Sequence, residues 1–155
     1  MDVFGGSDLF PLKFGLLSFW WLWFVLVFAT NLCEGLKVLH RVPWAWKFAS
    51  HNFQPIVLAL AEYAAPQWLP KVFFAGILLW QLLTVLLFGG ATIWSFEQRS
   101  LSWGFVDAAF AAGLSLWAAF MLADEFCKQY DPEKGHVLFF TVQLITLMAL
   151  HLLPS

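Results

Sequence analysis

Four long stretches of the chain are nearly free of charged residues. Residues 14–32, 72–96 and 137–153 lack Asp, Glu, Lys and Arg, and residues 101–123 contain only Asp107. A helix needs about 20 apolar residues to cross the hydrocarbon core of a bilayer. The pattern therefore predicts transmembrane helices over approximately 13–40, 70–96, 100–128 and 134–153.

These helices do not have the pattern of a soluble bundle. A helix of a soluble bundle carries a polar stripe, whereas residues 19–24 consist only of Phe, Trp and Leu. No basic region precedes Lys13, so we expect the first helix to be retained rather than cleaved as a signal peptide. We predict an all-α, integral membrane four-helix bundle that forms a single transmembrane domain over residues 1–155.

The first long loop, residues 43–70, contains a further apolar run. Pro55 suits the first turn of a helix, and Pro66 ends the run that follows it. This run is too short to cross a bilayer. The sequence therefore predicts a short interfacial or re-entrant helix in this loop.

Composition agrees with lipid as the solvent. The chain is 61% hydrophobic and 12% charged, whereas soluble domains are about 25% charged. The net charge of -2 and the lack of a basic patch argue against nucleic acid as a partner. Cys33 and Cys127 are expected at the same membrane face, and whether they pair stays open.

The flanking charges predict an orientation. The face with both termini carries two Lys and Arg residues, and the opposite face carries six. Cytoplasmic loops are enriched in Lys and Arg. We therefore expect a multi-pass protein of a bacterial-type inner (plasma) membrane with both termini outside.

Small and aromatic side chains suggest how the helices pack. Two ridges of small residues follow the third spanning helix at a spacing of four (Gly104, Ala108 and Ala112; Ala111, Ser115, Ala119 and Ala123). Small residues allow helix backbones to approach closely in lipid, so we expect these ridges to face the bundle and this helix to lie at its centre. On the first helix, Trp20, Trp21 and Trp23 are expected to face lipid or a partner protein.

Asp107 is the one carboxylate well inside a predicted span, and it lies on the ridge of Ala111 and Ser115, so we expect it to face the bundle. Antiparallel packing places Ser18, Thr92 and His151 near its depth. Charged groups inside a membrane are costly and are usually paired. Three interpretations stay open: a carboxylate favoured by the helix N-terminus and water, a structural hydrogen bond to His151 or Thr92, or a proton or ligand site formed by these four residues.

A second group of polar residues lies toward the opposite face. Amide side chains bond between helices in lipid, which predicts interhelical fastening. A pocket for a small polar head group, such as a quinone ring, is the alternative. The group consists of Thr30, Asn31, Glu34, Gln81, Thr84, Thr141 and Gln143.

The histidines raise the question of haem b. Of the four, His40 and His136 are the pair that can converge at one face, and both lie at helix ends. The spacing of His and carboxylates does not predict a metal site. We therefore predict no cofactor, with quinone and haem b kept as alternatives.

Two segments resemble a known family of small four-helix integral membrane proteins that is described only as having unknown function. They are 28–34, with Asn31-Leu32 shortly before Glu34, and 80–87, with Trp80-Gln81 before Thr84. The resemblance implies the four-helix fold with a long first loop, and it implies no activity. It marks Asn31, Glu34, Trp80 and Gln81.

Three functions are compatible with these patterns. The favoured one is a non-catalytic membrane subunit that stabilises a larger membrane protein complex, such as a respiratory or other electron-transfer assembly. Its support is the small size, the absence of a reactive constellation in the sequence, and aromatic side chains in excess of the needs of four helices. The alternatives are a quinone- or haem-associated redox module and a small transporter or channel component.

Overall fold

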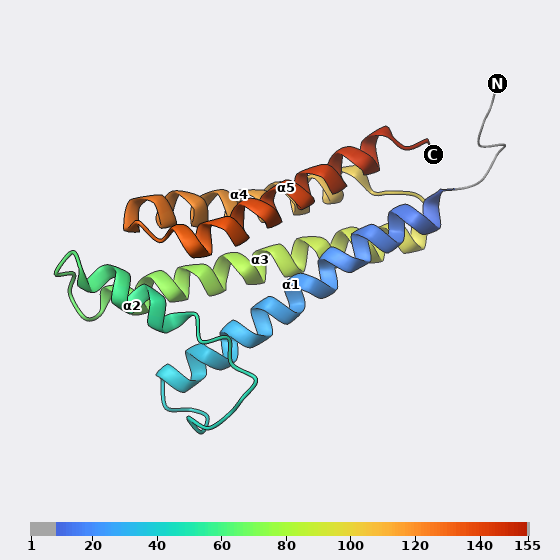
Figure 1. Cartoon of the computed structure of the whole chain (residues 1–155). Helices are drawn as coiled ribbons and strands as arrows, with labels where there is room; N and C mark the ends of the chain where they lie inside the picture. Colours follow the sequence, from blue (N-terminus) through green and yellow to red (C-terminus); the bar gives the residue numbers. More distant parts are fainter. Residues whose placement is uncertain (1–8, 155) are drawn as a thin grey trace.

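The computed structural model describes residues 9–154, which form five α-helices (Figure 1). Four of them, α1, α3, α4 and α5, are long and apolar enough to cross a membrane. The predicted all-α four-helix membrane bundle is therefore confirmed. The helices are α1 (Phe10–Val38), α2 (Phe53–Ala61), α3 (Leu69–Gln98), α4 (Trp103–Cys127) and α5 (Tyr130–Leu152).

Local sequence explains where the long helices begin and end. Pro11 and Pro70 occupy the first turns of α1 and α3, where a missing backbone N–H costs no hydrogen bond. Arg99 and Lys128 end α3 and α4 in the left-handed conformation, with φ of 53° and 55°. This conformation reverses the chain into the two short turns of the bundle.

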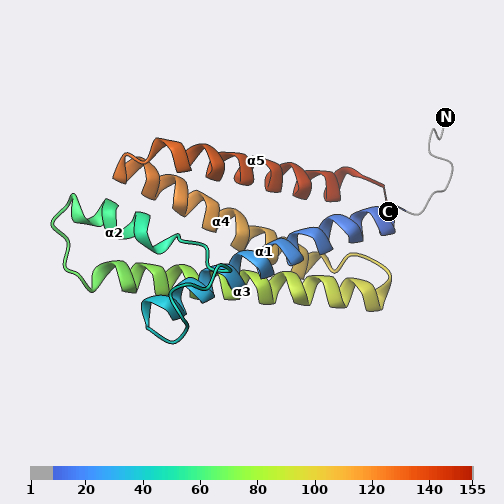
Figure 2. The same ribbon diagram turned by 60° about the horizontal axis from the view of Figure 1, so that its bottom comes forward.

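Helices α3 and α4 form the middle of the bundle. Helix α3 packs against α1, α2 and α4, whereas α4 packs against α3 and α5. Figure 2 shows α1 crossing over α3, with the α4–α5 hairpin alongside. The third spanning helix, α4, therefore shares the middle of the bundle with α3, and its Trp117 also reaches Phe24 of α1.

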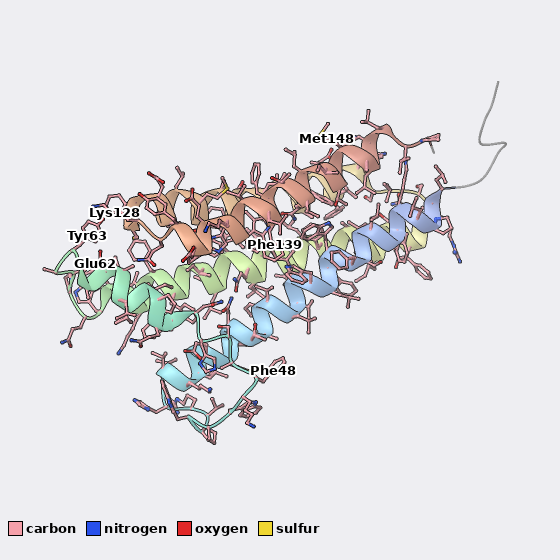
Figure 3. The ribbon with its side chains drawn as sticks, viewed as in Figure 1. Phe48, Glu62, Tyr63, Lys128, Phe139 and Met148 are labelled. Carbon is pink, nitrogen blue, oxygen red and sulfur yellow. The ribbon has the colours of Figure 1, made fainter. Side chains whose placement is uncertain are left out.

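Large aromatic side chains fill the space between the long helices. Phe24 of α1 stacks on Phe88 of α3 at 5.4 Å and on Trp117 of α4 at 5.9 Å between ring centroids. Phe139 of α5 lies 5.1 Å from the rings of both Trp23 and Trp117 (Figure 3). These rings connect all four spanning helices.

The tryptophans of α1 therefore do not form an outward surface. Trp20 is 2% exposed, and the Trp21 ring packs over the backbone of Gly89. The lipid-facing positions of α1 belong instead to Phe19, Leu22 and Leu26. The expectation that Trp20, Trp21 and Trp23 face outward is wrong.

The small residues of α4 also face the other way from the prediction. The buried face of α4 contains Val106, Phe110, Leu116 and Trp117, together with Ala109 and Gly113. Gly104, Ala108, Ala111 and Ser115 are exposed. Ala112 and Ala119 of the predicted ridges are half-buried. Bulky side chains that interlock with α3 and α5 thus set the rotation of α4, and most positions of the small-residue ridges point outward.

Helix α2 belongs to a segment, residues 39–61, that folds back along α1 and that we call the re-entrant segment. After α1 ends, the chain folds back along it, and the Ser50 N–H donates to the Thr30 carbonyl oxygen at 3.2 Å. Helix α2 then runs outward beside α3 (Figures 1 and 2). The predicted short helix in the first long loop is therefore present.

Gly113 allows the close approach of α4 and α5. A Cβ atom at this position would lie 2.4 Å from Nε2 of Gln143, a side chain with 0% exposure. We expect Gly113→Ala to lower the melting temperature of the purified protein in detergent, because the buried carboxamide has to move. In a Gln143→Ala background, the same substitution should be neutral or stabilising.

Gly104→Ala is the matched control, because no atom lies within 4 Å of the new Cβ atom. It should leave stability unchanged or raise it by up to about 1 kcal/mol through helix propensity. An equal loss for Gly113→Ala with and without Gln143 would contradict the predicted contact.

Candidate functional site

Three amide side chains meet where the re-entrant segment contacts α1 and α3. Nδ2 of Asn31 donates to Oε1 of Gln81 at 3.1 Å, and Nδ2 of Asn52 donates to Oδ1 of Asn31 at 2.9 Å. Asn31 and Gln81 are almost fully buried. We call Asn31, Asn52 and Gln81 the amide junction. It fastens α1 to α3 and holds the start of α2 against both helices.

The other members of the predicted second polar group do not join the junction. The Thr84 hydroxyl donates to the Trp80 carbonyl of its own helix at 2.9 Å. Thr30 does the same within α1, and Thr141 is exposed. Gln143 lies on Gly113 of α4, and its amide nitrogen and oxygen have no hydrogen-bond partner.

Asn52 is a junction residue that the sequence analysis missed. It belongs to a polar stretch between two apolar segments, which is typical of a solvated loop. The turn that folds residues 39–52 back along α1 brings it to Asn31. Its sequence position alone carried no signal for this contact.

Glu34 lies one helical turn after Asn31 on the same side of α1. Its side chain is 4% exposed, and its Oε2 atom has no hydrogen-bond partner. Lys37 is also buried, and its Nζ lies 5.9 Å from the centroid of the Trp44 ring. The end of α1 thus buries both an acid and a base, without an ion pair between them among the described residues.

The predicted contact between Asp107 and His151 is present. Nε2 of His151 lies 2.8 Å from Oδ1 of Asp107. The His151 ring stacks on Trp103 at 4.3 Å between centroids. Lys13 extends the group, because its Nζ donates to the Leu153 carbonyl at 2.8 Å and lies 5.7 Å from the Trp103 ring. This group ties the start of α1 to the ends of the α4–α5 hairpin.

The other two predicted members stay apart from Asp107. The Thr92 hydroxyl donates to the Phe88 carbonyl at 2.8 Å, and the Ser18 hydroxyl is buried without a partner. The side chains of His151 and Asp107 are 47% and 52% exposed. Asp107 therefore lies on the outward face of α4, and the expectation that it faces the bundle is wrong. The bulky side chains of α4 pack against α3 and α5, which turns the face with Asp107 outward.

A second aspartate–histidine pair lies at the other end of the hairpin. Nδ1 of His136 contacts Oδ2 of Asp124, and both side chains are mostly buried. The His136 ring also packs on Phe120 and Trp117, at 4.9 and 6.1 Å between centroids. Sequence reasoning considered His136 only for haem and missed Asp124, because both residues lie at helix ends where charges are common.

The structure does not bring His40 and His136 together. His40 follows α1 in a left-handed conformation, with φ of 55° and an exposed side chain. The Nδ1 atom of His136 contacts the Asp124 carboxylate instead. Within residues 9–154, no group of three or more His, Cys, Asp and Glu residues could hold a metal ion.

The two cysteines are free thiols. Cys127 directly follows the spanning part of α4, Trp103–Phe126. Burial, followed by the nearby carboxylates of Asp124 and Glu62, raises the pKa of the Cys127 thiol above its ordinary value. A raised pKa leaves less of the reactive thiolate at neutral pH.

Comparison with known proteins gives no functional assignment. No family model, curated protein sequence or solved structure matches the chain. The resemblance to the four-helix family of unknown function therefore stays a prediction. What the chain can do has to be argued from its own residues.

The bond between Asn31 and Gln81 can be tested with a double-mutant cycle. We expect Asn31→Leu and Gln81→Leu each to lower the free energy of unfolding in mixed micelles, because each leaves a buried amide without its partner. The coupling energy should be about 0.6 kcal/mol and at most about 1.7 kcal/mol, the range found between membrane helices. Gln98→Leu, at an exposed site, is the control, and a coupling energy of zero would contradict the bond.

The reactivity of Cys127 reports the negative charge around it. In a Cys33→Ala background, we expect alkylation of Cys127 to be slow at neutral pH and to keep accelerating above the ordinary thiol pKa. Glu62→Gln removes one of the charges that raise this pKa, so it should speed up alkylation at neutral pH. Glu97→Gln, at the far end of α3, should not, and equal rates in all three proteins would refute the assignment.

Proposed function

We propose that this protein is a non-catalytic integral membrane subunit that packs against a larger membrane protein complex and stabilises it. The observation that carries the proposal is the outward small-residue ridge of α4, formed by Gly104, Ala108, Ala111 and Ser115. Contact between such surfaces is a principal way in which helices associate in lipid. The chain does not use this ridge for its own packing.

The ridge differs from the other exposed surfaces of the bundle. Most large exposed side chains of the other surfaces are apolar, such as Leu79, Leu86 and Leu122, which suit contact with acyl chains. The Ser115 hydroxyl donates to the Ala111 carbonyl at 2.6 Å, so it has a partner within its own helix. The side chains of the ridge are small, and the Ser115 hydroxyl needs no further partner, so the backbone of a neighbouring helix can approach closely.

We extend the proposal to a respiratory or other electron-transfer assembly in a bacterial-type inner membrane. This step rests on analogy with other small helical subunits. Gentle native purification, followed by mass spectrometry of the co-eluting proteins, identifies the partner complex.

Substitutions on the ridge test the proposal directly. We expect Ala111→Leu combined with Ser115→Leu to abolish co-elution with the partner complex, because the larger side chains keep the neighbouring helix away. The melting temperature of the purified protein should not fall, since both positions are exposed. Ala75→Leu places the same side chain at an exposed site of α3 and should leave the complex intact.

Two outcomes would contradict the proposed subunit role. One is native protein that migrates alone at its own mass under gentle extraction. The other is a complex that survives the ridge substitutions as well as it survives Ala75→Leu.

A transport or quinone-binding role is the second candidate. Irregular backbone at membrane depth is typical of ligand and ion sites, and Glu34 is buried with an oxygen that has no hydrogen-bond partner among the described residues. If this role holds, ion flux into liposomes or recovery of bound quinone should depend on Glu34 and be lost in Glu34→Gln. Glu97→Gln, with an exposed acid, is the control.

A further inference from the structure

A cleft separates α2 from the turn between α4 and α5. Helix α2 packs against α3 along one side, and its other side faces the turn across a cavity of about 730 Å³. The cleft is broad and mostly apolar, with polar side chains toward one end. Its lining residues are Pro55, Leu58, Ala61, Glu62, Gln129 and Pro132.

Tyr63 joins the two walls of the cleft through a hydrogen bond and a ring stack. The Tyr63 hydroxyl donates to the Phe126 carbonyl at 2.6 Å, and the two rings stack at 5.1 Å between centroids with 18° between their planes. Figure 3 shows Tyr63 and Glu62 at the same end of the molecule as Lys128. The tether joins the end of α2 to the end of α4, so the cleft is bounded by defined walls.

The position of the cleft matches the boundary between hydrocarbon and headgroups. Helix α2 ends at Ala61, the spanning part of α4 ends at Phe126, and α5 begins at Tyr130. These ends lie together on one face of the bundle (Figure 1). Pro55 and Leu58, one to two turns before the end of α2, line the apolar part of the cleft.

The polar end of the cleft offers both signs of charge. Among the described residues, Glu62 and Lys128 have no ion-pair partner, whereas Lys134 is paired with Asp131 at 2.8 Å and His136 with Asp124. Glu62 lines the cleft, and Lys128 directly precedes Gln129 of the opposite wall. Glu62 also contributes to the raised pKa of the Cys127 thiol, which places its charge beside this wall.

We propose that this cleft binds an aminophospholipid of the phosphatidylethanolamine type. The primary ammonium of the headgroup donates hydrogen bonds to the Glu62 carboxylate, the phosphate meets Lys128, and the Gln129 carboxamide bonds the headgroup. An acyl chain lies along Leu58 and Pro55. The carboxylate selects against phosphatidylglycerol, which has no cation, and against phosphatidylcholine, whose quaternary nitrogen has no N–H to donate.

Lipid retention on the purified full-length protein tests this assignment. The protein is exchanged through detergent, incubated with equal amounts of phosphatidylethanolamine, phosphatidylglycerol and phosphatidylcholine, and examined by native mass spectrometry. We expect bound phosphatidylethanolamine to predominate. Glu62→Gln should reduce that preference about tenfold, the effect of losing one hydrogen bond to a charged group.

Leu58→Trp separates the cleft from the rest of the lipid-facing surface. The side chain of Leu58 is 60% exposed in the cleft wall, so the indole can enter the cavity without disturbing the core. We expect this variant to keep its helicity and melting temperature but to lose retained phospholipid of every type. Glu97→Gln, an exposed acid at the opposite end of the bundle, should bind like the unmodified protein.

Several results would overturn the proposal. They are equal retention of the three lipids, an unchanged preference in Glu62→Gln, retention by Leu58→Trp, or a polypeptide in the cleft instead of lipid. Because the ridge of α4 is not involved, failure here leaves the proposed subunit role standing, and loss of the partner complex leaves lipid retention unaffected.

Discussion

Lipid as the solvent is the constraint on which the rest of this structure depends. Acyl chains solvate Leu and Phe as well as a protein interior does, so helices gain little by hiding apolar surface from the membrane. Close contact between rigid side chains has to hold them together instead. The stacked rings of Phe24, Phe88, Trp117 and Phe139 provide that contact and connect α1, α3, α4 and α5. The orientation of each helix follows from where its aromatic residues interlock.

Polar side chains fasten the bundle at a few defined places. Aspartate–histidine pairs fasten the α4–α5 hairpin at both ends, through Asp107 with His151 and through Asp124 with His136. The amide junction around Asn31 fixes the depth at which the re-entrant segment turns outward. Buried polar groups in lipid have no water to replace a lost partner. The bond between Asn31 and Gln81 is therefore specific for one register of α1 and α3.

The two surfaces proposed for binding follow from the same packing. Because the large side chains of α4 turn toward α3 and α5, the small residues around Ala111 have to point outward. Because α2 is held by α3 on one side and by Tyr63 at its end, its remaining side stays open as the cleft near Glu62. One surface suits the backbone of a neighbouring helix, and the other suits a lipid with a charged headgroup.

By itself, the sequence determined the membrane class, the four spans and the short additional helix, because span length and charge-free runs depend on local composition. Antiparallel depth named His151 as one of three candidate neighbours of Asp107, and the structure selected it. The rotation of each helix needed the tertiary structure. Small residues and aromatic residues can each face a neighbour or lipid, and only the fit of Trp20, Trp23 and Trp117 against the other helices decided which side turned inward. The same holds for Asn52, whose contact with Asn31 depends on a loop that folds back along α1. Long-range packing made these choices, and no local pattern encodes it.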